Sequence, residues 1–238
     1  MCSSDLEKIK RSFKRKGYLL TDKLVNSLEY GVPQDRERVI LFGIHKSICK
    51  NTPNEMRIVL KNHFSWGSNQ NYNSGKIKLL PWPKQTPFEE NSVLEIPENI
   101  LPELTIEYWF KKNEVYSHRN ADDYFIPRKG KDKINSICEG DVSRKSYKRL
   151  HRWRYSPTVA YGNNEVHLHP YKSRRLSVAE SLALQSLPKE FIVNPDLSLT
   201  DKFKTIGNGV PFLMSYSIAT YIKAFLLEYV DEKTIKDR

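Results

Sequence analysis

Residues 29–43 read EYGVPQDRERVILFG, a polar cluster that runs directly into an apolar segment. Gln34, Arg36 and Arg38 alternate in this cluster, so an extended backbone would place the three side chains on one face. An amide and two guanidinium groups at the end of a buried strand are costly unless something pairs with them. Residues 39–44 are almost continuously apolar, which predicts a strand that is covered on both faces and begins beside a polar site.

The segment before this stretch predicts two more elements. Residues 4–16 place their apolar side chains on one helical face, with Ser4 or Asp5 as the cap and Gly17 as the stop. Residues 18–20 form a short strand candidate.

The charge balance narrows the class of partner. The chain has 238 residues, of which 39% are hydrophobic, and its mean hydropathy is −0.61. Its 39 Lys and Arg residues outnumber the 28 Asp and Glu residues, which gives a net charge of +11. Such an excess favours a polyanion, most of all nucleic acid, although a merely soluble basic surface gives the same sum.

Residues 45–170 differ from the rest of the chain in composition and in hydrophobic periodicity. They contain many prolines, an Asn-, Gly- and Ser-rich loop and no long periodic helix, which predicts a loop-rich, mostly β module. Residues 111–154, the basic segment, have 13 basic and 6 acidic residues with five interleaved aromatic side chains, a pattern typical of phosphate-contacting surfaces. The candidate DNA contacts are Lys129, Lys131, Arg144, Lys145, Lys148, Arg149, Arg152 and Arg154.

Helical patterns return after residue 176. Residues 177–180, SVAE, form a capping box that begins a helix, and Pro188 ends this helix. Residues 207–211, GNGVP, lead into a second helix over residues 211–229. The apolar stripe of this last helix is wide, so part of it is expected to need cover from another chain. That part comprises Phe212, Tyr216, Ile222 and Phe225.

Several classes of protein are disfavoured. Cys2, Cys49 and Cys138 lie far apart, which fits a reducing cytoplasmic setting better than a disulfide framework. His167 and His169 have no Cys-x-x-Cys nearby, so no metal site is predicted. No apolar run resembles a signal peptide or is long enough to span a membrane, so no membrane partner is expected.

Three segments of the chain resemble motifs of one family. YGVPQDRER before a strand, SRRLSVAESLALQSLP, and TIGNGVP before a helix closely resemble the eighth, ninth and tenth motifs of DNA (cytosine-5)-methyltransferases. The resemblance covers nearly the whole chain but only the C-terminal half of a complete enzyme. It implies an α/β fold. Residues 1–46 and 205–238 would form the C-terminal part of a Rossmann-like methyltransferase domain. A target-recognition domain over residues 47–204 would be inserted into it.

The resemblance also implies a chemistry. Members of the family flip a cytosine out of the duplex, attack its C6 with a cysteine thiolate, and transfer methyl from S-adenosylmethionine to C5. The attack moves electron density toward O2 and N3, so a fixed positive donor at O2 would stabilise the transition state. By resemblance Arg38 is this donor, and Arg36 and Gln34 organise the site. The motif by itself favours a structural role, in which Arg36 and Arg38 take part in a salt bridge under the strand.

The resemblance assigns roles to three further residues. Asn208 and Gly209 are similar to residues that close over the methyl donor, which is compatible with a loop that needs a permissive backbone. Arg175 is similar to an arginine that braces the recognition module, so its expected role is architectural.

Three family features are missing from the sequence. They are the Phe-x-Gly-x-Gly donor loop, the Pro-Cys nucleophile and the Glu-Asn-Val general acid, and none of the three cysteines follows a proline. The sequence therefore predicts the DNA-recognising half of a split cytosine-5 methyltransferase of a restriction-modification system, inactive alone. An N-terminal polypeptide would complete a heterodimer that acts on double-stranded DNA, and a cognate restriction endonuclease is a further candidate partner. The alternatives are an inactive truncated remnant and a DNA-binding module without catalysis.

Overall fold

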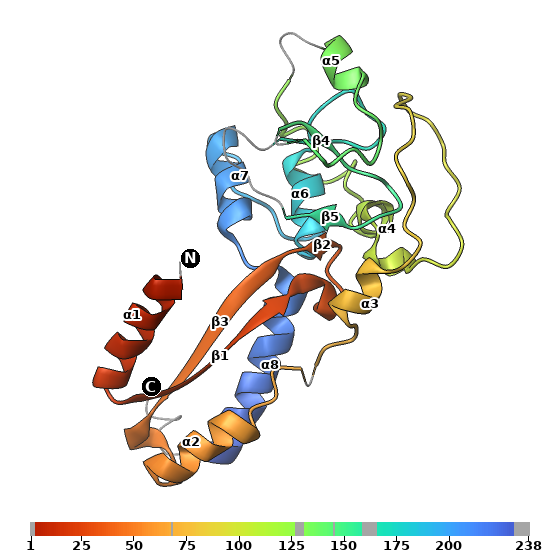
Figure 1. Ribbon diagram of the computed structural model, residues 1–238. Helices are drawn as coiled ribbons and strands as arrows, with labels where there is room; N and C mark the ends of the chain where they lie inside the picture. Colours follow the sequence, from red (N-terminus) through yellow and green to blue (C-terminus); the bar gives the residue numbers. More distant parts are fainter. Residues whose placement is uncertain (1–2, 68, 127–130, 145, 159–165, 231–238) are drawn as a thin grey trace. The chain divides into compact units, whose positions relative to one another are not determined.

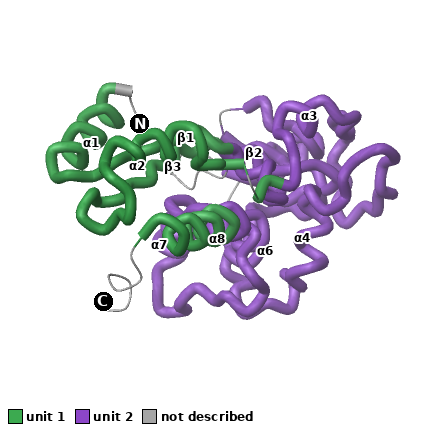
Figure 2. The backbone as a smooth tube through the Cα atoms, turned by 90° about the horizontal axis from the view of Figure 1, so that it is seen from below, with its two compact units in different colours: residues 1–25, 37–70, 216–238 green, residues 26–36, 71–215 purple. Residues whose placement is uncertain are grey.

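The computed structural model describes residues 3–67, 69–126, 131–144, 146–158 and 166–230. The chain divides into two compact units, which Figure 2 distinguishes by colour. Unit 1 comprises residues 1–25, 37–70 and 216–238, and unit 2 comprises residues 26–36 and 71–215. The chain passes between the units four times, so each unit is assembled from segments that are far apart in the sequence.

Unit 1 contains a two-stranded sheet (Figure 1). The backbone amide of Lys46 donates to the carbonyl of Gly17 beside one end of the strands, and that of Ser27 donates to the carbonyl of Arg36 beside the other. The two strands are therefore antiparallel. The elements that contribute to this unit are α1 (Ser3–Arg15), β1 (Tyr18–Asn26), β3 (Glu37–His45), the 3-10 helix η2 (Lys46–Ile48), α2 (Pro53–Asn62) and most of α8 (Phe212–Tyr229).

The helix α1, the strand β3 and the long helix α8 lie where they were predicted. The expectation that β3 is covered on both faces is wrong, because it belongs to a two-stranded sheet and Val39 is 40% exposed. Strand β1 is longer than the short strand predicted at residues 18–20. A polar stretch interrupts its apolar pattern, and Asp22 in that stretch forms a salt bridge of 2.7 Å with Lys10 of α1. Gly17 makes the turn between α1 and β1 at φ +88°, where a Cβ would lie 2.8 Å from Nε2 of His45.

An aromatic cluster forms the core of unit 1. Phe42 of β3 stacks on Phe64, and Phe225 of α8 packs edge-on against both rings. Met56 and Leu60 of α2 are buried in the same cluster. Helix α2 lies in the segment where no long helix was predicted, although Thr52 and Glu55 form a capping box before this run and Pro53 occupies its first turn.

Unit 2 is loop-rich, as predicted, but its regular structure is mainly helical. Among the described residues of this unit, the strands have two residues each, so the expectation of a mostly β module is wrong; they are β2 (Gln34–Asp35), β4 (Lys148–Arg149), β5 (Ser156–Pro157) and β6 (His167–Leu168). The pairs β2–β5 and β4–β6 are both parallel. The other elements are the helices η1 (Ser27–Tyr30), α3 (Ser74–Lys78), η3 (Pro102–Leu104), α4 (Ile106–Lys112), α5 (Lys131–Asn135), α6 (Val178–Leu184) and α7 (Leu199–Asn208).

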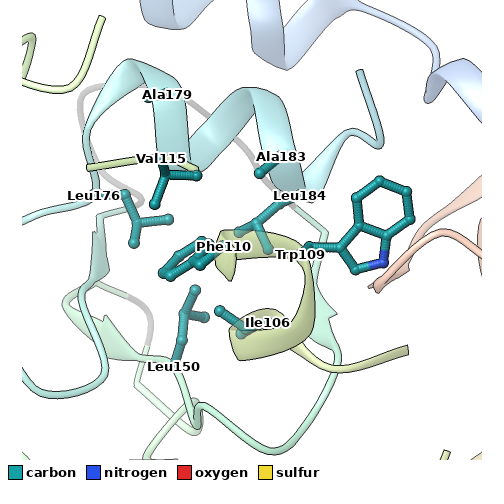
Figure 3. Packing of buried hydrophobic residues seen from close by; sticks show 9 residues of the cluster. All are labelled: Ile106, Trp109, Phe110, Val115, Leu150, Leu176, Ala179, Ala183 and Leu184. Carbon is teal, nitrogen blue, oxygen red and sulfur yellow. The ribbon is translucent and has the colours of Figure 1, made fainter. Parts of the chain in front are cut away.

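Helices α4 and α6 form the centre of the core of unit 2 (Figure 3). Phe110 of α4 packs among Leu150, Leu176 and the residues of α6, which is buried along its whole length. The predicted capping box is confirmed, because Ser177 accepts from the amide of Glu180 and Glu180 accepts from the amide of Ser177. A fully buried helix needs such a cap, since no water reaches its first amides.

The two compact units differ from the domain limits expected from the sequence. Residues 26–36 and 205–215 belong to unit 2, and residues 47–70 belong to unit 1. The physical reasons are the packing of α2 on Phe42 and the bonds of Arg36 to the end of α7. Within the described residues no single helix could cross a membrane, while α7 and α8 taken together, with a 41° bend, pass on length and composition alone.

Candidate functional site

The polar cluster of residues 34–38 follows a tightly closed turn. Asn26 and Glu29 form a capping box on η1, and Gly31 ends this short helix at φ +80°. The hydroxyl of Ser27 donates to the carbonyl of Gln34 at 2.5 Å, and Nδ2 of Asn26 donates to Oδ1 of Asp35 at 2.6 Å. These bonds fix the backbone of the cluster before any ligand is considered.

Gln34 and Arg36 point into unit 2. Both side chains are buried, and Nε2 of Gln34 donates to the carbonyl of Leu184 at 3.2 Å. Nη2 of Arg36 donates to the carbonyls of Gly207 and Gly209, each at 2.9 Å. A guanidinium group at the C-terminal end of α7 is placed favourably, because helix carbonyls there lack partners and carry partial negative charge.

These contacts join all three segments that resemble family motifs. Gln34 and Arg36 come from the first segment, Leu184 from the second, and Gly207 and Gly209 from the third. The first segment lies 150 or more residues before its partners in the other two segments. Both side chains therefore bond to the backbone of the other two segments, and their role in organising the site stays a prediction.

Two residues at this junction were missed by the sequence analysis. Gln185 donates from Nε2 to the carbonyl of Ile206 at 3.2 Å, and its own carbonyl accepts from the amide of Phe212. Oγ of Ser186, a residue with φ +54°, accepts from the amide of Leu213 at 3.1 Å. The available signal was a pair of polar residues directly after the apolar run of α6.

Asn208 and Gly209 lie at the end of α7. Asn208 is its last residue and is exposed, and Gly209 donates from its amide to the carbonyls of Thr205 and Ile206. Gly209 has φ −64°, so it does not need the permissive backbone that was expected. Its constraint is space, because a Cβ would lie 3.2 Å from the carbonyl oxygen of Ile206.

Arg38 differs from its neighbours in the cluster. It belongs to unit 1, on β3, and is half-buried, and Nη1 donates at 2.6 Å to the carbonyl of the adjacent Glu37. Partial burial lowers the pKa of Arg38 from its ordinary value, because the charged form loses solvent. Among the described residues Arg38 has no salt bridge, so its charge is available to a ligand.

The eight candidate DNA contacts separate into distinct environments. Arg149 is fully buried and donates to four backbone carbonyls, those of Ile134, Ile137, His169 and Lys172. Arg152 is buried and pairs with Glu139 at 2.7 Å. Both guanidinium groups are therefore used inside unit 2, which corrects the expectation that they contact DNA.

The remaining candidates are accessible or not described. Lys131 and Arg144 are exposed, and Lys148 and Arg154 are half-buried. Arg144 forms a salt bridge of 3.0 Å with Asp141. Lys129 and Lys145 lie outside the described residues.

Arg174 and Arg175 lie in different environments, and the architectural role expected of Arg175 stays a prediction. Arg174 forms two bonds to the buried carboxylate of Glu180, at 2.6 and 2.8 Å. Burial opposes ionisation of Glu180, but its contacts with His169 and Arg174 outweigh burial and lower the pKa of Glu180. Arg175 instead lies over the rings of Phe125 and Tyr147 and has no salt bridge among the described residues.

The comparison with known families decides the classification. Residues 3–224 match the family described as C-5 cytosine-specific DNA methylase. The chain belongs to this family. The match covers every residue of the polar cluster and of the junction with α6 and α7, so the resemblance read from the three motifs is confirmed.

Relatives of the chain are type II methyltransferases. It is 50% identical over 218 residues to M.NmeDI of Neisseria meningitidis serogroup C, which covers 92% of this chain and 49% of that protein. It is 26% identical to the type II methylase M.HgiDII of Herpetosiphon aurantiacus, over 91% of this chain and 58% of that protein. It therefore spans about half the length of these curated relatives.

Two further likenesses concern fold and length. A solved Escherichia coli prophage protein, described as a DNA modification methyltransferase, shares the mixed α/β fold with a TM-score of 0.54 at 16% identity, over 95% of this chain and 66% of that one. M.AquIB of Picosynechococcus, a type II methyltransferase, is 33% identical over 97 residues. These are 37% of this chain but 70% of M.AquIB, so that relative is shorter than this chain.

The described residues offer no evident substitute for the missing nucleophile. Cys49 and Cys138 are free and half-buried, and burial raises the pKa of the Cys49 thiol. Cys2 lies outside the described residues. In the part of the chain that the structure describes, no group of three or more His, Cys, Asp or Glu side chains could hold a metal ion.

Proposed function

We propose that this chain is the DNA-recognising half of a cytosine-5 DNA methyltransferase, completed by a second polypeptide that carries the nucleophile and most of the methyl-donor site. The observation that carries the proposal is the share of its relatives' length that this chain matches. More than nine-tenths of the chain matches about half of its relatives, and its sequence lacks a Pro-Cys pair and the Phe-x-Gly-x-Gly loop.

In this proposal the polar cluster has two functions. Gln34 and Arg36 hold the ends of α6 and α7, and Arg38 offers its guanidinium group to O2 of the flipped cytosine. A fixed cation at O2 stabilises the charge that develops when a nucleophile attacks C6. S-adenosylmethionine would supply the methyl group, and the exposed side chain of Asn208 is the part of this chain proposed to contact it.

The surface of α8 favours a partner. Phe212 and Tyr216 were expected to lose cover, and their side chains are 38% and 63% exposed. Phe225 was expected to lose cover too, but it is buried in the aromatic core of unit 1, and Ile222 is half-buried against the same core. Leu227 on the same helix is 52% exposed, so an apolar face is left for the complementary polypeptide. A cognate restriction endonuclease is a further proposed partner of the assembled enzyme.

A second candidate function is a DNA-binding module without catalysis. The observation that favours it is the burial of Gln34 and Arg36, because a non-catalytic module would also need them for packing. Arg38 separates the two functions, since no described contact beyond the adjacent carbonyl accounts for its charge.

The decisive experiment is reconstitution. The chain is mixed with a polypeptide corresponding to the other half of M.NmeDI, and incorporation of labelled methyl into duplex DNA is measured. We expect incorporation with both polypeptides and none with either alone. Methyl transfer by the purified chain alone would contradict the split, and DNA binding without transfer in the mixture would favour the non-catalytic module.

Substitution of Arg38 in this mixture tests the catalytic assignment. Arg38→Ala is expected to slow the single-turnover rate about a hundredfold or more, because a preorganised donor at a developing negative charge is lost. The affinity for duplex DNA should change much less. Arg57→Ala, which removes an exposed guanidinium from the same unit, is the matched control and should leave the rate unchanged. An unchanged rate in Arg38→Ala would return this residue to a structural role.

A further inference from the structure

Unit 2 contains a small cavity beside the polar cluster, which we call the Arg154 cavity. Its volume is about 180 Å³. Its position is fixed by the parallel pair β2–β5, in which Gln34 is opposite Ser156 and Asp35 is opposite Pro157. The cavity is lined by Asp35, Gly140, Val142, Leu150, His151, Arg154, Tyr155 and Pro157.

Arg154 gives this cavity a free positive charge. Its side chain is half-buried, and among the described residues its guanidinium group makes no salt bridge or hydrogen bond. Arg149 and Arg152, in the same basic segment, both have protein acceptors for their guanidinium groups. A partly buried cation without an acceptor has lost some of its hydration and gains most from an anion that enters the cavity.

The neighbouring side chains restrain this charge. The guanidinium group of Arg154 lies over the ring of Tyr155, 5.3 Å from its centroid. That ring is itself buried and packs edge-on against Trp82. His151 is buried, and its Nδ1 accepts from the amide of Trp153 at 3.0 Å. A cation that is held in place binds an anion with less loss of side-chain entropy than a free surface lysine does.

The one carboxylate on the cavity wall is already neutralised. Asp35 accepts from Asn26 at 2.6 Å through Oδ1 and pairs with Lys78 at 2.9 Å through Oδ2. The other lining groups include the apolar side chains of Val142, Leu150 and Pro157, so they add no negative charge. The local balance around the cavity therefore favours an anion.

We propose that the Arg154 cavity seats one backbone phosphate of the DNA that this chain recognises. The inference rests on the proposed function, since it takes DNA as the ligand. The cavity is smaller than the roughly 300–1,000 Å³ of sites for drug-sized molecules, so it suits a single phosphodiester better than a whole nucleoside cofactor. A guanidinium group matches the geometry of phosphate oxygens. A phosphate held beside β2 would fix the register of the duplex relative to the polar cluster, which makes Arg154 a positioning residue.

The test combines a variant with modified DNA. Duplexes in which one phosphate at a time is replaced by a neutral methylphosphonate are titrated with the full chain in its reconstituted complex. For the unaltered chain we expect one position at which the replacement weakens binding about tenfold. Arg154→Ala should weaken binding of unmodified DNA by a similar factor and show no further loss at that position. The slope of log K against log salt should fall in magnitude by about 0.9.

Two further variants separate position from charge. Arg119→Ala removes one exposed positive charge from the same unit and should leave the sensitive position unchanged. Arg154→Lys keeps the charge without the planar group and should recover only part of the affinity. Thermal unfolding of Arg154→Ala should be close to that of the unaltered chain, because among the described residues this side chain has no hydrogen bond to lose and gives up only its contact with the Tyr155 ring.

The outcomes distinguish this inference from the proposed function. A complex that methylates DNA, while Arg154→Ala keeps the same affinity and the same methylphosphonate profile, would overturn the inference alone. A complex that neither binds nor methylates DNA would remove both. A loss in Arg154→Ala that is spread evenly over all positions would show general attraction and would also overturn the seated phosphate.

Discussion

The polar cluster at residues 34–38 and the basic segment at residues 111–154 divide in the same way. In each, part of the positive charge is turned inward and bonded, and part remains available. In the cluster, Arg36 bonds to the end of α7 while Arg38 has only the adjacent carbonyl. In the basic segment, Arg152 pairs with Glu139 while Arg154 has no acceptor among the described residues. A charged motif therefore contains residues that hold the fold and residues that face a ligand, and a sum of charges does not separate them.

The largest expected effect compares two arginines of the basic segment. Arg152→Ala leaves the buried carboxylate of Glu139 without its partner, and breaking such a pair costs about 3–5 kcal/mol of unfolding free energy. Arg144→Ala breaks an exposed pair with Asp141, which is worth about 0–1 kcal/mol. Urea unfolding of the two variants measures the difference. Similar losses would show that inward and outward arginines do not differ in the way described.

The same comparison within the polar cluster should give a somewhat smaller effect. Arg36→Ala removes two charge-assisted bonds to the end of α7, and the loss of unfolding free energy should be about 3 kcal/mol. Arg38→Ala should cost no more than about 0.5 kcal/mol, because its side chain is half-exposed and weakly bonded. The measurement is the denaturant midpoint of each variant, compared where the denaturant dependence of the unfolding free energy is the same. An Arg38 variant as unstable as the Arg36 variant would contradict the division.

A third inward group sharpens the comparison through pH. His167 is buried on β6, and burial, followed by the nearby Lys148, lowers the pKa of its imidazole to about 3. The pKa of His167 in the folded chain therefore lies below its value near 6.5 in the unfolded chain. The contribution of the neutral imidazole to the unfolding free energy is fully present above pH 6.5 and is lost as the pH falls toward 3. The loss is about 1.4 kcal/mol per pH unit, or roughly 2 kcal/mol between pH 6.5 and pH 5.

The measurement is the unfolding free energy at pH 7 and at pH 5. His167→Gln should lose less stability over this interval than the unaltered chain does. Burial also lowers the pKa values of His151 and His169, so a residual dependence on pH is expected in the variant. His63→Gln, at an exposed position, is the control. Equal losses in the unaltered chain and in His167→Gln would show that this imidazole does not resist protonation.

Local features of the fold could be read from the sequence. The capping box at Ser177 and Glu180 predicted the start of α6, and the apolar run before Gly43 predicted β3, because short-range hydrogen bonds and periodicity fix such elements. Helix α2 could have been found in the same way from Thr52, Pro53 and Glu55, but the loop-like composition around it outweighed that signal.

Long-range contacts could not be predicted in this way. Nothing in the sequence near Arg36 indicates that its acceptors are the carbonyls of Gly207 and Gly209. Likewise, the basic segment has the same composition whether Arg152 faces DNA or Glu139, since only packing decides which side chains turn inward. The resemblance named the residues of the candidate site, and the structure divides them by environment.

The bonds between Arg36 and the end of α7 have a consequence for the order of events during synthesis. The donor and its farther acceptor are 173 residues apart. Ribosomes add about 5–20 residues per second, so Arg36 would wait roughly 10–35 s for that carbonyl. Throughout this interval Arg36 lacks its acceptor on Gly209, although Leu28 of the same segment, residues 26–36, can already pack on Ile77 and Trp82. Co-translational folding of unit 2 can therefore be completed only after residue 209 has been synthesised.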